Sequence, residues 1–551
     1  MLTTGVRCVR LGLLLAGFTL LTIVLTWPLC GHLWDHVIDA SIFGPVGAMW
    51  RQDVFLTMWI LAWGAHALGT DPTQLWHANV LRPMEMPLAG SEHMLGYQWL
   101  FAPLYLTTNN PVFAQQLVIV LTFVFTGVAM ALLVREVTGS EPAAWVGGCA
   151  LAFCPWRFGE LTRVQMLGTF YLPLAVLCLA RYLRGGGWRA LAAMAVCVVL
   201  QALTSFYLGY FAFAVIGFLL LPSLLARTLT LRQVASIALA LGAAAVLLIP
   251  VSLPYTRLHA AGVIPADPYA DPSALAFFLS ARPWLRVPRS LGYVAIGLAL
   301  LGCRRLRHEV WPGRAALLTL AAGGYVLALG PALPIGGHLI PLPYRILGWV
   351  VPGLSAVRYP MRFTLLSVFA VALLAARGVA SVTEQLRNRT QGAAVAMLAA
   401  IALLLEARTF PGGHILLTPV AVGNTVPPIY GWLHDHGNGG VVVEVPVGDD
   451  TFRGYLREAI YMYFSTYHWQ PLVNGFTGYP APESIAARAS ARRLPDLAAL
   501  DTLRATTNAR WVLVHRAQLD PAAQAAWQAA EPPWRTAAEF GGDVVFDVAS
   551  P

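Results

Sequence analysis

The chain is dominated by apolar runs of roughly 20 residues, the length that a helix needs to cross the hydrocarbon core of a bilayer. Only 11% of its 551 residues are charged, and the mean hydropathy is +0.63. A soluble domain carries roughly 25% charged residues. The runs predict a polytopic α-helical membrane protein with eleven spans, near residues 11–29, 111–134, 142–156, 167–183, 188–204, 207–226, 233–252, 290–303, 315–330, 363–380 and 392–407.

The arginines test this layout, because loops on the cytoplasmic side of a membrane are enriched in them. With the N-terminus inside, the short inner segments hold 15 arginines, and the much longer outer segments hold 11. Of the 14 acids before residue 408, ten fall outside or at the outer membrane edge. We therefore expect a cytoplasmic N-terminus, an extracytoplasmic C-terminus, and any chemistry on the outer face.

All 36 basic residues are arginine, a bias that we interpret as the mark of a GC-rich bacterial genome. The expected location is therefore the bacterial cytoplasmic (inner) membrane. Seven cysteines lie in or beside apolar segments, without disulfide or zinc spacing.

The composition changes after residue 407. Residues 1–407 form the expected membrane domain, whose first outer loop covers residues 30–110. Residues 408–551 carry 10 arginines and 13 acids, and the runs "GGVVVEVPV" and "RWVLVHR" are typical of strands. A stretch with helical spacing, Pro495 to Thr506, lies between these runs. We predict a small extracytoplasmic α/β domain over residues 408–551.

Asp53 stands directly before an apolar and aromatic run, "VFLTMWILAW". A carboxylate partly removed from water is a better proton acceptor, which suits a general base facing an acceptor hydroxyl. The alternative is a helix N-cap, a position that aspartate favours. The helical patterns at residues 54–68 and 93–106 fit membrane-surface helices better than spans, because a single additional span would invert the arginine distribution.

A second polar cluster, Asp35, His36 and Asp39, lies in "WDHVIDA". Two carboxylates and a histidine at helical spacing could hold a divalent metal, but an isolated D-H-x-x-D pattern is not specific. No cofactor is firmly indicated, and a divalent cation is the less favoured interpretation.

Two groups of arginines are expected on the outer face, where basic residues are depleted. Arg157, Glu160 and Arg163 recur every three residues, either as an ion-pair set or as part of an anion site with one guanidinium left for phosphate. Arg358 and Arg362 flank "YPM" at headgroup depth, where they could hold a lipid-linked phosphate or diphosphate. Ordinary snorkelling is the alternative for this pair, and the depletion favours phosphate binding.

Four further polar residues could line an outer cavity, although each alone is more typical of a structural role: His77, Asn79, His93 and Tyr207. The chain lacks GxGxxG, P-loop, HExxH and GxSxG motifs, so nucleotide-driven and serine-hydrolase chemistry have no support. No nucleic-acid partner is expected.

Several segments are similar to a bacterial branch of GT-C membrane proteins: "QDVFLTMWILAWGAHAL", "FCPWRFGELTRVQML", "LTSFYLGYF", "GLSAVRYPMRF" and "YMYFSTYHWQPLVNGFTGYPAPES". With its acidic first outer loop and C-terminal outer domain, the chain resembles the GT-C superfamily of polyprenyl-phosphate-sugar-dependent glycosyltransferases. Protein O-mannosyltransferases and the aminoarabinose transferase of lipid A are members. The resemblance covers most of the chain.

The resemblance implies a catalytic aspartate in the first outer loop, which Asp53 matches best, with Asp35 or Asp39 as fallback positions. It also implies basic outer residues that bind the carrier phosphate, a role for Arg358 and Arg362, with Arg157 as a third candidate. The adjacent Asp-Glu pair of the mannosyltransferases is absent from this loop.

The implied reaction is inverting transfer of a sugar from a polyprenyl-phosphate donor to a lipid, glycan or protein acceptor. One alternative is a lipid or glycan transporter or flippase, which predicts ionisable residues in the middle of spans, where this chain has almost none. Another is an O-antigen polymerase or ligase that uses diphosphate-linked glycans. A large central outer loop would favour that enzyme class, and here the first outer loop is the longest.

Overall fold

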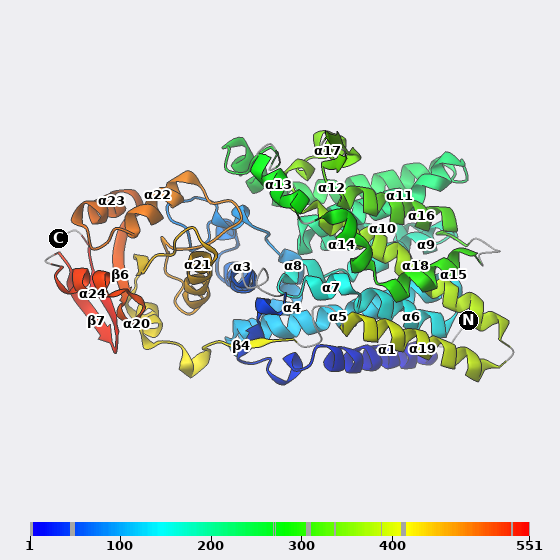
Figure 1. Cartoon of the computed structure of the whole chain (residues 1–551), viewed down its shortest axis with the longest axis horizontal. Helices are drawn as coiled ribbons and strands as arrows, with labels where there is room; N and C mark the ends of the chain where they lie inside the picture. Colours follow the sequence, from blue (N-terminus) through cyan, green and yellow to red (C-terminus); the bar gives the residue numbers. More distant parts are fainter. Residues whose placement is uncertain are drawn as a thin grey trace. The chain divides into compact units, whose positions relative to one another are not determined.

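The computed structural model describes residues 4–43, 50–267, 269, 272–280, 282–304, 310–335, 338–386, 388–408, 415–530 and 533–549. The chain divides into two compact units, which are described separately (Figure 1). The first unit comprises Met1–Gly31, Leu117–Ser252 and Pro265–Ile415, and the second comprises His32–Gln116, Leu253–Ile264 and Leu416–Pro551.

The first unit is built almost entirely of helices, with one short hairpin. It contains α1 (Thr4–Leu25), α6 (Glu141–Ala152), α7 (Pro155–Gly159), α8 (Val164–Leu167), α9 (Tyr171–Leu183), α10 (Trp188–Thr204), α11 (Phe206–Leu225), α13 (Pro272–Ser280), α14 (Pro283–Leu291), α15 (Tyr293–Arg304), α16 (Arg314–Ala328), β2 (Ala332–Ile335), β3 (His338–Pro341), α17 (Pro343–Val350), α18 (Thr364–Gln385), α19 (Arg389–Arg408), and most of α5 (Pro111–Thr138) and α12 (Leu231–Ala260).

Seven helical stretches in the described part of the chain are long and apolar enough to cross a membrane, which confirms the predicted class of protein. They are Cys8–Leu25, Pro111–Thr138, Val164–Leu183, Phe206–Leu225, Leu231–Ala260, Pro360–Gln385 and Arg389–Ala407. The remaining four predicted runs fall on the shorter helices α6, α10, α15 and α16. The count of eleven spans therefore stays a prediction.

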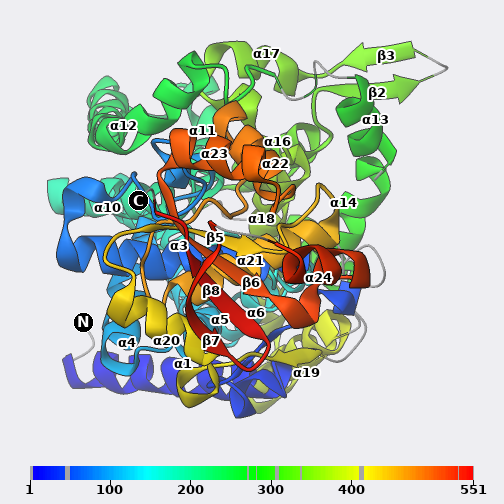
Figure 2. The ribbon, with the colours of Figure 1, turned by 90° about the vertical axis from the view of Figure 1, so that its left-hand side faces the viewer.

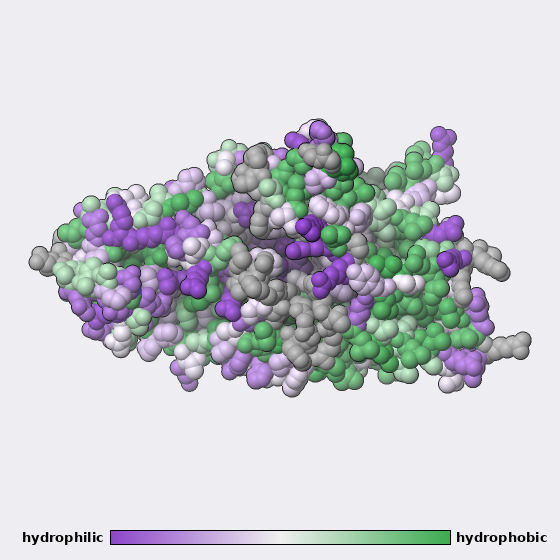
Figure 3. All heavy atoms as spheres, in the orientation of Figure 1, coloured by the Kyte–Doolittle hydropathy of each residue, from purple (hydrophilic) through white to green (hydrophobic). Residues whose placement is uncertain are grey.

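Helix α18 is the centre of the first unit, with 89% of its apolar stretch buried. It packs against α6, α15 and α16. Gly378 of α18 and Gly302 of α15 face each other so closely that a Cβ at either position would strike the opposite backbone. Small residues of this kind let membrane helices approach closely. By contrast, α1, α12 and α19 bury little of their apolar surface, and Figure 3 shows hydrophobic side chains over α1 and α19.

Charged residues predicted on the cytoplasmic side contact one another in this unit. Arg10 and Arg135 both pair with Glu141, at 3.3 and 3.0 Å. Arg181 pairs with Glu136 at 2.9 Å. The contacts place these ends of α1, α5 and α9 together, and the side of the membrane on which they lie stays a prediction.

The second unit combines residues of the predicted first outer loop with the C-terminal part of the chain. Its elements are β1 (His36–Ile38), α3 (Arg51–Thr70), α4 (Gln98–Thr108), β4 (Leu417–Pro419), α20 (Pro428–His436), β5 (Val441–Val445), α21 (Phe452–Ser465), α22 (Pro482–Ala491), α23 (Leu497–Thr507), β6 (Ala509–His515), α24 (Pro521–Gln528), β7 (Arg535–Phe540) and β8 (Asp543–Asp547). Helix α3 covers the first pattern expected at the membrane surface, α4 covers residues 98–106 of the second, and neither is among the candidate spans of the described residues. The expected domain boundary at residue 408 stays a prediction.

A four-stranded sheet in the order β5-β6-β8-β7 organises the C-terminal part of this unit (Figure 2). Strands β5 and β6 are parallel, and β8 runs antiparallel to both β6 and β7. A core of Val, Leu and Ala side chains joins the sheet to α22, α23 and Trp527 of α24. The predicted strands are confirmed as β5 and β6, and the predicted helix is confirmed as α23. A second pairing joins β1 to β4, with Val37 opposite Thr418.

Candidate functional site

The first unit gathers several of the predicted outer residues into one group. Short proline-led turns place them: Pro155 begins α7, before the turn that carries Glu160, and Pro360 begins a 3-10 turn that leads into α18. We call this group the arginine cluster, and it consists of Glu160, Arg163, Tyr207, Tyr359 and Arg362.

Glu160 lies between the two guanidinium groups of the arginine cluster. Its Oε2 is 3.5 Å from Nη1 of Arg163 and 3.6 Å from Nη2 of Arg362. The Arg362 guanidinium carbon lies 4.8 Å from the ring centre of Tyr207 and 5.3 Å from that of Tyr359, within the range of cation–π attraction. The Tyr359 backbone N–H donates to the Tyr207 hydroxyl at 3.3 Å. The three charged side chains are mostly buried.

This arrangement favours an anion for two physical reasons. Two guanidiniums lie beside one carboxylate, where little water remains to screen their charge from an anion. Tyr207 is also the second residue of α11, and Arg362 lies in the turn that precedes α18. The N-terminal ends of these two long helices carry partial positive charge. The cluster lies at the ends of candidate membrane spans, and phosphate binding there stays a prediction.

Arg358 and Arg157 have different surroundings from the two clustered arginines. Arg358 is exposed, and its backbone carbonyl accepts a hydrogen bond from the Tyr269 hydroxyl. Arg157 is fully buried, and its guanidinium donates to the hydroxyls of Thr122 and Thr126 at 3.2 and 3.0 Å. These surroundings favour a structural role for Arg157, and its part in phosphate binding stays a prediction.

Asp53 belongs to the second unit, in the first turn of α3. The N-cap of α3 is Trp50, which makes no side-chain capping bond, and the Asp53 backbone N–H donates to the Trp50 carbonyl at 3.1 Å. The capping interpretation is therefore wrong in position, because the carboxylate lies three residues into the helix. A half-buried acid there still complements the helix dipole. Its role as a general base stays a prediction.

Asp39 borders a cavity of about 250 Å³ within the second unit. The cavity is lined mainly by apolar side chains of β1, β4, α3 and α21. Arg51 donates to both carboxylate oxygens of Asp39, at 3.0 and 3.1 Å, and Ser41 and Thr418 donate at 2.9 and 2.8 Å. Burial alone would raise the pKa of Asp39, but these bonds outweigh it and lower the pKa. A carboxylate stabilised as an anion is a weak proton acceptor, so Asp39 is poorly suited as a base.

The metal cluster suggested by the sequence is only partly assembled. Asp35 and His36 lie together, with Oδ1 and Nδ1 at 2.7 Å, and His32 joins them. One possible ligand atom from each of these three residues lies within 4.8 Å of the others. Asp39 does not join this group but forms an ion pair with Arg51. Two imidazoles and a carboxylate are a ligand set that suits zinc, although the three side chains are largely exposed.

The three remaining loop residues, His77, Asn79 and His93, make structural contacts within the second unit. His77 Nδ1 lies 2.6 Å from a backbone carbonyl oxygen. Asn79 is buried and donates to Ser465 of α21 at 3.2 Å. His93 is fully enclosed, and burial lowers its pKa to about 3, so the ring is neutral. None of these residues enters our proposal for the chemistry.

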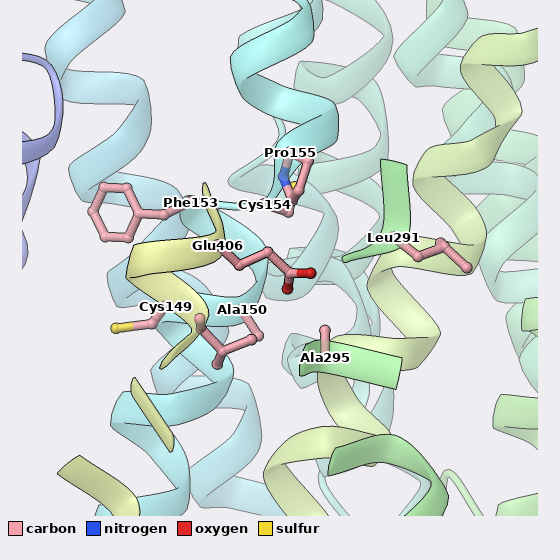
Figure 4. A pocket seen from close by; sticks show the side chains of 9 residues that line it. Cys149, Ala150, Phe153, Cys154, Pro155, Leu291, Ala295 and Glu406 are labelled. Atoms are coloured by element: carbon pink, nitrogen blue, oxygen red, sulfur yellow. The ribbon is translucent and has the colours of Figure 1, made fainter. Parts of the chain in front are cut away.

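A small cavity in the first unit surrounds Glu406 of α19 (Figure 4). The carboxylate accepts the backbone N–H groups of Tyr293 and Val294, at 2.5 and 3.0 Å, and so caps α15 from a neighbouring helix. The cavity measures about 10 Å³, the room of one water molecule. It is too small for a substrate, and Glu406 is structural.

A buried network in the C-terminal sheet holds a charged histidine. His515 Nε2 lies 3.0 Å from Glu444 Oε2, and its Nδ1 lies 3.2 Å from Asp543 Oδ1. The Tyr430 hydroxyl donates to the same Glu444 oxygen at 2.8 Å. Burial alone would lower the pKa of His515, but the bonds to Asp543 and Glu444 raise it to about 9. Burial raises the pKa of Glu444.

This network predicts that the C-terminal sheet loses stability as the pH rises. The contribution of His515 is fully present below about pH 6.5, the pKa of a free histidine, and disappears as the pH passes about 9. The shift corresponds to about 3 kcal/mol, and the raised pKa of Glu444 acts in the same direction. Hydrogen exchange of β6 in the full-length protein, corrected for intrinsic rates, should therefore show protection falling by about 100-fold from pH 6.5 to 9.

The variant His515→Gln should lower this protection at pH 6.5 and flatten its pH dependence. The control is His434→Gln, which changes an exposed histidine of α20 and should keep the wild-type slope. An unchanged slope in the His515 variant would show that another group titrates.

Sequence reasoning missed Tyr359 and the pairing of Arg51 with Asp39. Tyr359 stands between Arg358 and Arg362 in the sequence, and an aromatic residue next to two arginines could have indicated the cation–π contact that the structure shows with Arg362. The pairing of Arg51 with Asp39 joins residues in different elements, so no spacing rule indicates it.

Comparisons with solved structures give the class of fold: the chain has the fold of GT-C membrane glycosyltransferases. It is similar to the arabinofuranosyltransferase AftD from Mycobacteria, with a TM-score of 0.59 and 15% identity, over 98% of this chain and 40% of that one. A mutant form of AftD gives a TM-score of 0.57 and 17% identity, over 98% and 42% of the two chains. The Archaeoglobus fulgidus oligosaccharyltransferase in complex with Zn and sulfate gives 0.50 and 12%, over 96% and 72%.

These identities are low, so the likeness shows the fold alone. The chain spans about two fifths of the length of AftD. No protein-family model matches the chain, and no curated protein matches it in sequence.

Proposed function

We propose that this protein transfers a sugar from a polyprenyl-phosphate-linked donor to a lipid, glycan or protein acceptor. The observation that carries the proposal is the arginine cluster at the ends of apolar helices, in a chain with a glycosyltransferase fold. A lipid-linked phosphate needs an anion site at the edge of the membrane, with apolar helices beside it for the isoprenoid tail. The proposed location is the outer face of a bacterial cytoplasmic membrane, with the N-terminus inside.

In the proposed mechanism, Asp53 takes the proton from an acceptor hydroxyl, whose oxygen attacks the anomeric carbon of the donor sugar. The bond from that carbon to the phosphate oxygen breaks, and its electron pair leaves with the phosphate. Arg362 and Arg163, assisted by Arg358, stabilise the charge that develops on the leaving phosphate. Attack opposite the leaving group inverts the anomeric configuration. The phosphate leaves without a general acid, so one carboxylate suffices.

Transfer of radiolabel tests this proposal with the full-length protein reconstituted in liposomes. We expect label to move from a polyprenyl-phosphate sugar to an acceptor in a bacterial envelope extract, with release of polyprenyl phosphate. Heat-denatured protein is the control. Transfer only from diphosphate-linked glycans would instead indicate a polymerase or ligase, and movement of intact donor across the bilayer without transfer would indicate a flippase.

A further inference from the structure

The cavity of about 250 Å³ in the second unit is apolar apart from one charged border. Helices α3 and α21 pack against each other (Figure 1), and side chains such as Phe55 of α3 and Leu456 of α21 line the cavity. Strands β1 and β4, with the residues next to them, contribute the rest of the described lining. The ion pair of Asp39 and Arg51 forms the charged border. A lining of this kind suits an amphiphile with an apolar chain and a polar end.

The size and polarity of the cavity limit what it can hold. An apolar cavity of about 150 Å³ binds benzene, and by that ratio the cavity of about 250 Å³ has room for roughly ten carbon atoms. Water gains little there, because a buried water molecule needs several polar partners and most of the described lining is apolar. The cavity therefore suits the end of a hydrocarbon chain, and it is much smaller than a whole polyprenyl chain.

The cavity adjoins the start of a candidate membrane span. Val37 of β1 and Val54 of α3 line the cavity and pack in one buried cluster with Val112, in the part of α5 that belongs to the second unit. Asn110, directly before α5, donates to the backbone carbonyl of Trp34 at 2.8 Å. The Trp34 ring is exposed, as tryptophans at the membrane–water interface are. The cavity therefore lies near the end of a span, where lipid chains are at hand.

The cavity also borders the turn of α3 that carries the proposed base. Arg51 and Val54 line it, and Asp53 belongs to the same first turn. A general base must come within hydrogen-bond reach of the acceptor hydroxyl. A chain held in the cavity, with its polar end beside Arg51, brings a hydroxyl to this turn. The proposed site for the donor phosphate, by contrast, belongs to the first unit.

We infer that this cavity receives the hydrocarbon chain of a lipid acceptor and so selects a lipid, rather than a glycan or a protein, as the molecule that is glycosylated. This inference rests on the proposed function. The chain contributes binding that is the same in the ground state and in the transition state, because it lies away from the reacting atoms. The cavity therefore lowers the KM for the acceptor and leaves kcat to Asp53 and the arginines.

The first experiment locates a hydrocarbon probe in the full-length protein. The probe is decan-1-ol with a diazirine near its methyl end, at a fixed mole fraction in phosphatidylcholine nanodiscs. We expect mass spectrometry to find the peptides of β4 and α21 labelled above the level of the lipid-facing helix α19. In Ala421→Phe the labelling of α21 should fall at least about fivefold, because the added ring takes up roughly the 150 Å³ that benzene needs.

Ala526→Phe is the matched control, because it makes the same substitution at an exposed alanine of α24 outside the cavity lining. It should leave the labelling unchanged. Leu456→Trp fills the cavity from α21 and serves if Ala421→Phe does not fold. Labelling spread evenly over the apolar helices, or unchanged in the filled variants, would overturn the inference. Displacement of the probe by farnesyl phosphate at lower concentration than by decan-1-ol would assign the cavity to the donor's tail and overturn it as well.

Sugar transfer then shows whether the bound chain belongs to the acceptor. With decyl glucoside as acceptor, Ala421→Phe should raise the acceptor KM at least about fivefold and change kcat less than about twofold, as expected when uniform binding is lost. The donor KM should stay unchanged. Equal KM values for decyl glucoside and methyl glucoside in the wild type would contradict a role for the chain. If the probe labels the cavity but no acceptor receives sugar, the proposed function fails together with the acceptor assignment, while the hydrocarbon site stands.

Discussion

Asp53→Asn should lower the rate of sugar transfer by about 10²- to 10⁴-fold, the typical contribution of a general base. Asparagine has nearly the same shape as aspartate but cannot take a proton from the acceptor hydroxyl. The carboxylate lies three residues into α3 rather than at its N-cap, and the amide oxygen of asparagine can still accept a hydrogen bond there. We therefore expect the folded state and the affinity for the donor to persist while kcat falls. Single-turnover transfer of radiolabel measures this effect directly.

Asp71→Asn is the matched control for this prediction. Asp71 follows the last residue of the same helix, α3, and is exposed, and its carboxylate accepts hydrogen bonds from Thr73. Its loss removes a charge and a local turn contact, but not the proposed base. Both variants should melt within a few degrees of the wild type. Full activity in Asp53→Asn would remove Asp53 from the chemistry, and Asp35→Asn would then be the next variant to measure.

The fold could be predicted largely from sequence because its signals are local. Apolar runs of consecutive residues correspond to the long apolar helices, and β-branched runs of consecutive residues correspond to β5 and β6. The sequence did not predict strands β7 and β8, because "RTAAEF" and "DVVFD" are short, and the strands are recognisable mainly through the pairing of β8 with β6 and of β7 with β8. The number of spans stays a prediction, because α6 and α15 are each only 12 residues long, shorter than the roughly 20 residues that cross a bilayer.

The candidate site could be predicted only in part, because its contacts join distant segments. Depletion of outer arginines favoured Arg358 and Arg362 as phosphate-binding residues, and the structure brings Arg362 to Glu160 together with Arg163, which the spacing had left open between an ion pair and an anion site. The role of Arg157 stays a prediction, and its partners Thr122 and Thr126, which lie 35 and 31 residues earlier on α5, could not be foreseen. Hydroxyls contributed by a neighbouring helix can satisfy a buried guanidinium, and a linear sequence does not reveal that.

Arg362→Ala should lower kcat/KM for the donor by about 10²- to 10³-fold, the usual cost of losing one preorganised group that stabilises a developing negative charge. The guanidinium also rests against two tyrosine rings and shares the Glu160 carboxylate. Arg362→Lys keeps the charge but loses the planar fork and most of the ring contact, so its activity should fall between those of alanine and wild type. Transfer at varied donor concentrations gives kcat and KM separately.

Arg345→Ala is the control, because Arg345 is an exposed arginine of α17 that lies outside the arginine cluster. It should change the donor kinetics less than twofold, since exposed charges are largely screened by salt. Equal losses in Arg362→Ala and Arg345→Ala would mean that bulk surface charge, and not a defined site, attracts the donor. A loss in Arg362→Ala that excess donor fully overcomes would mean that Arg362 binds the phosphate in the ground state only. A loss that persists at saturating donor places Arg362 on the leaving group in the transition state, as the mechanism requires.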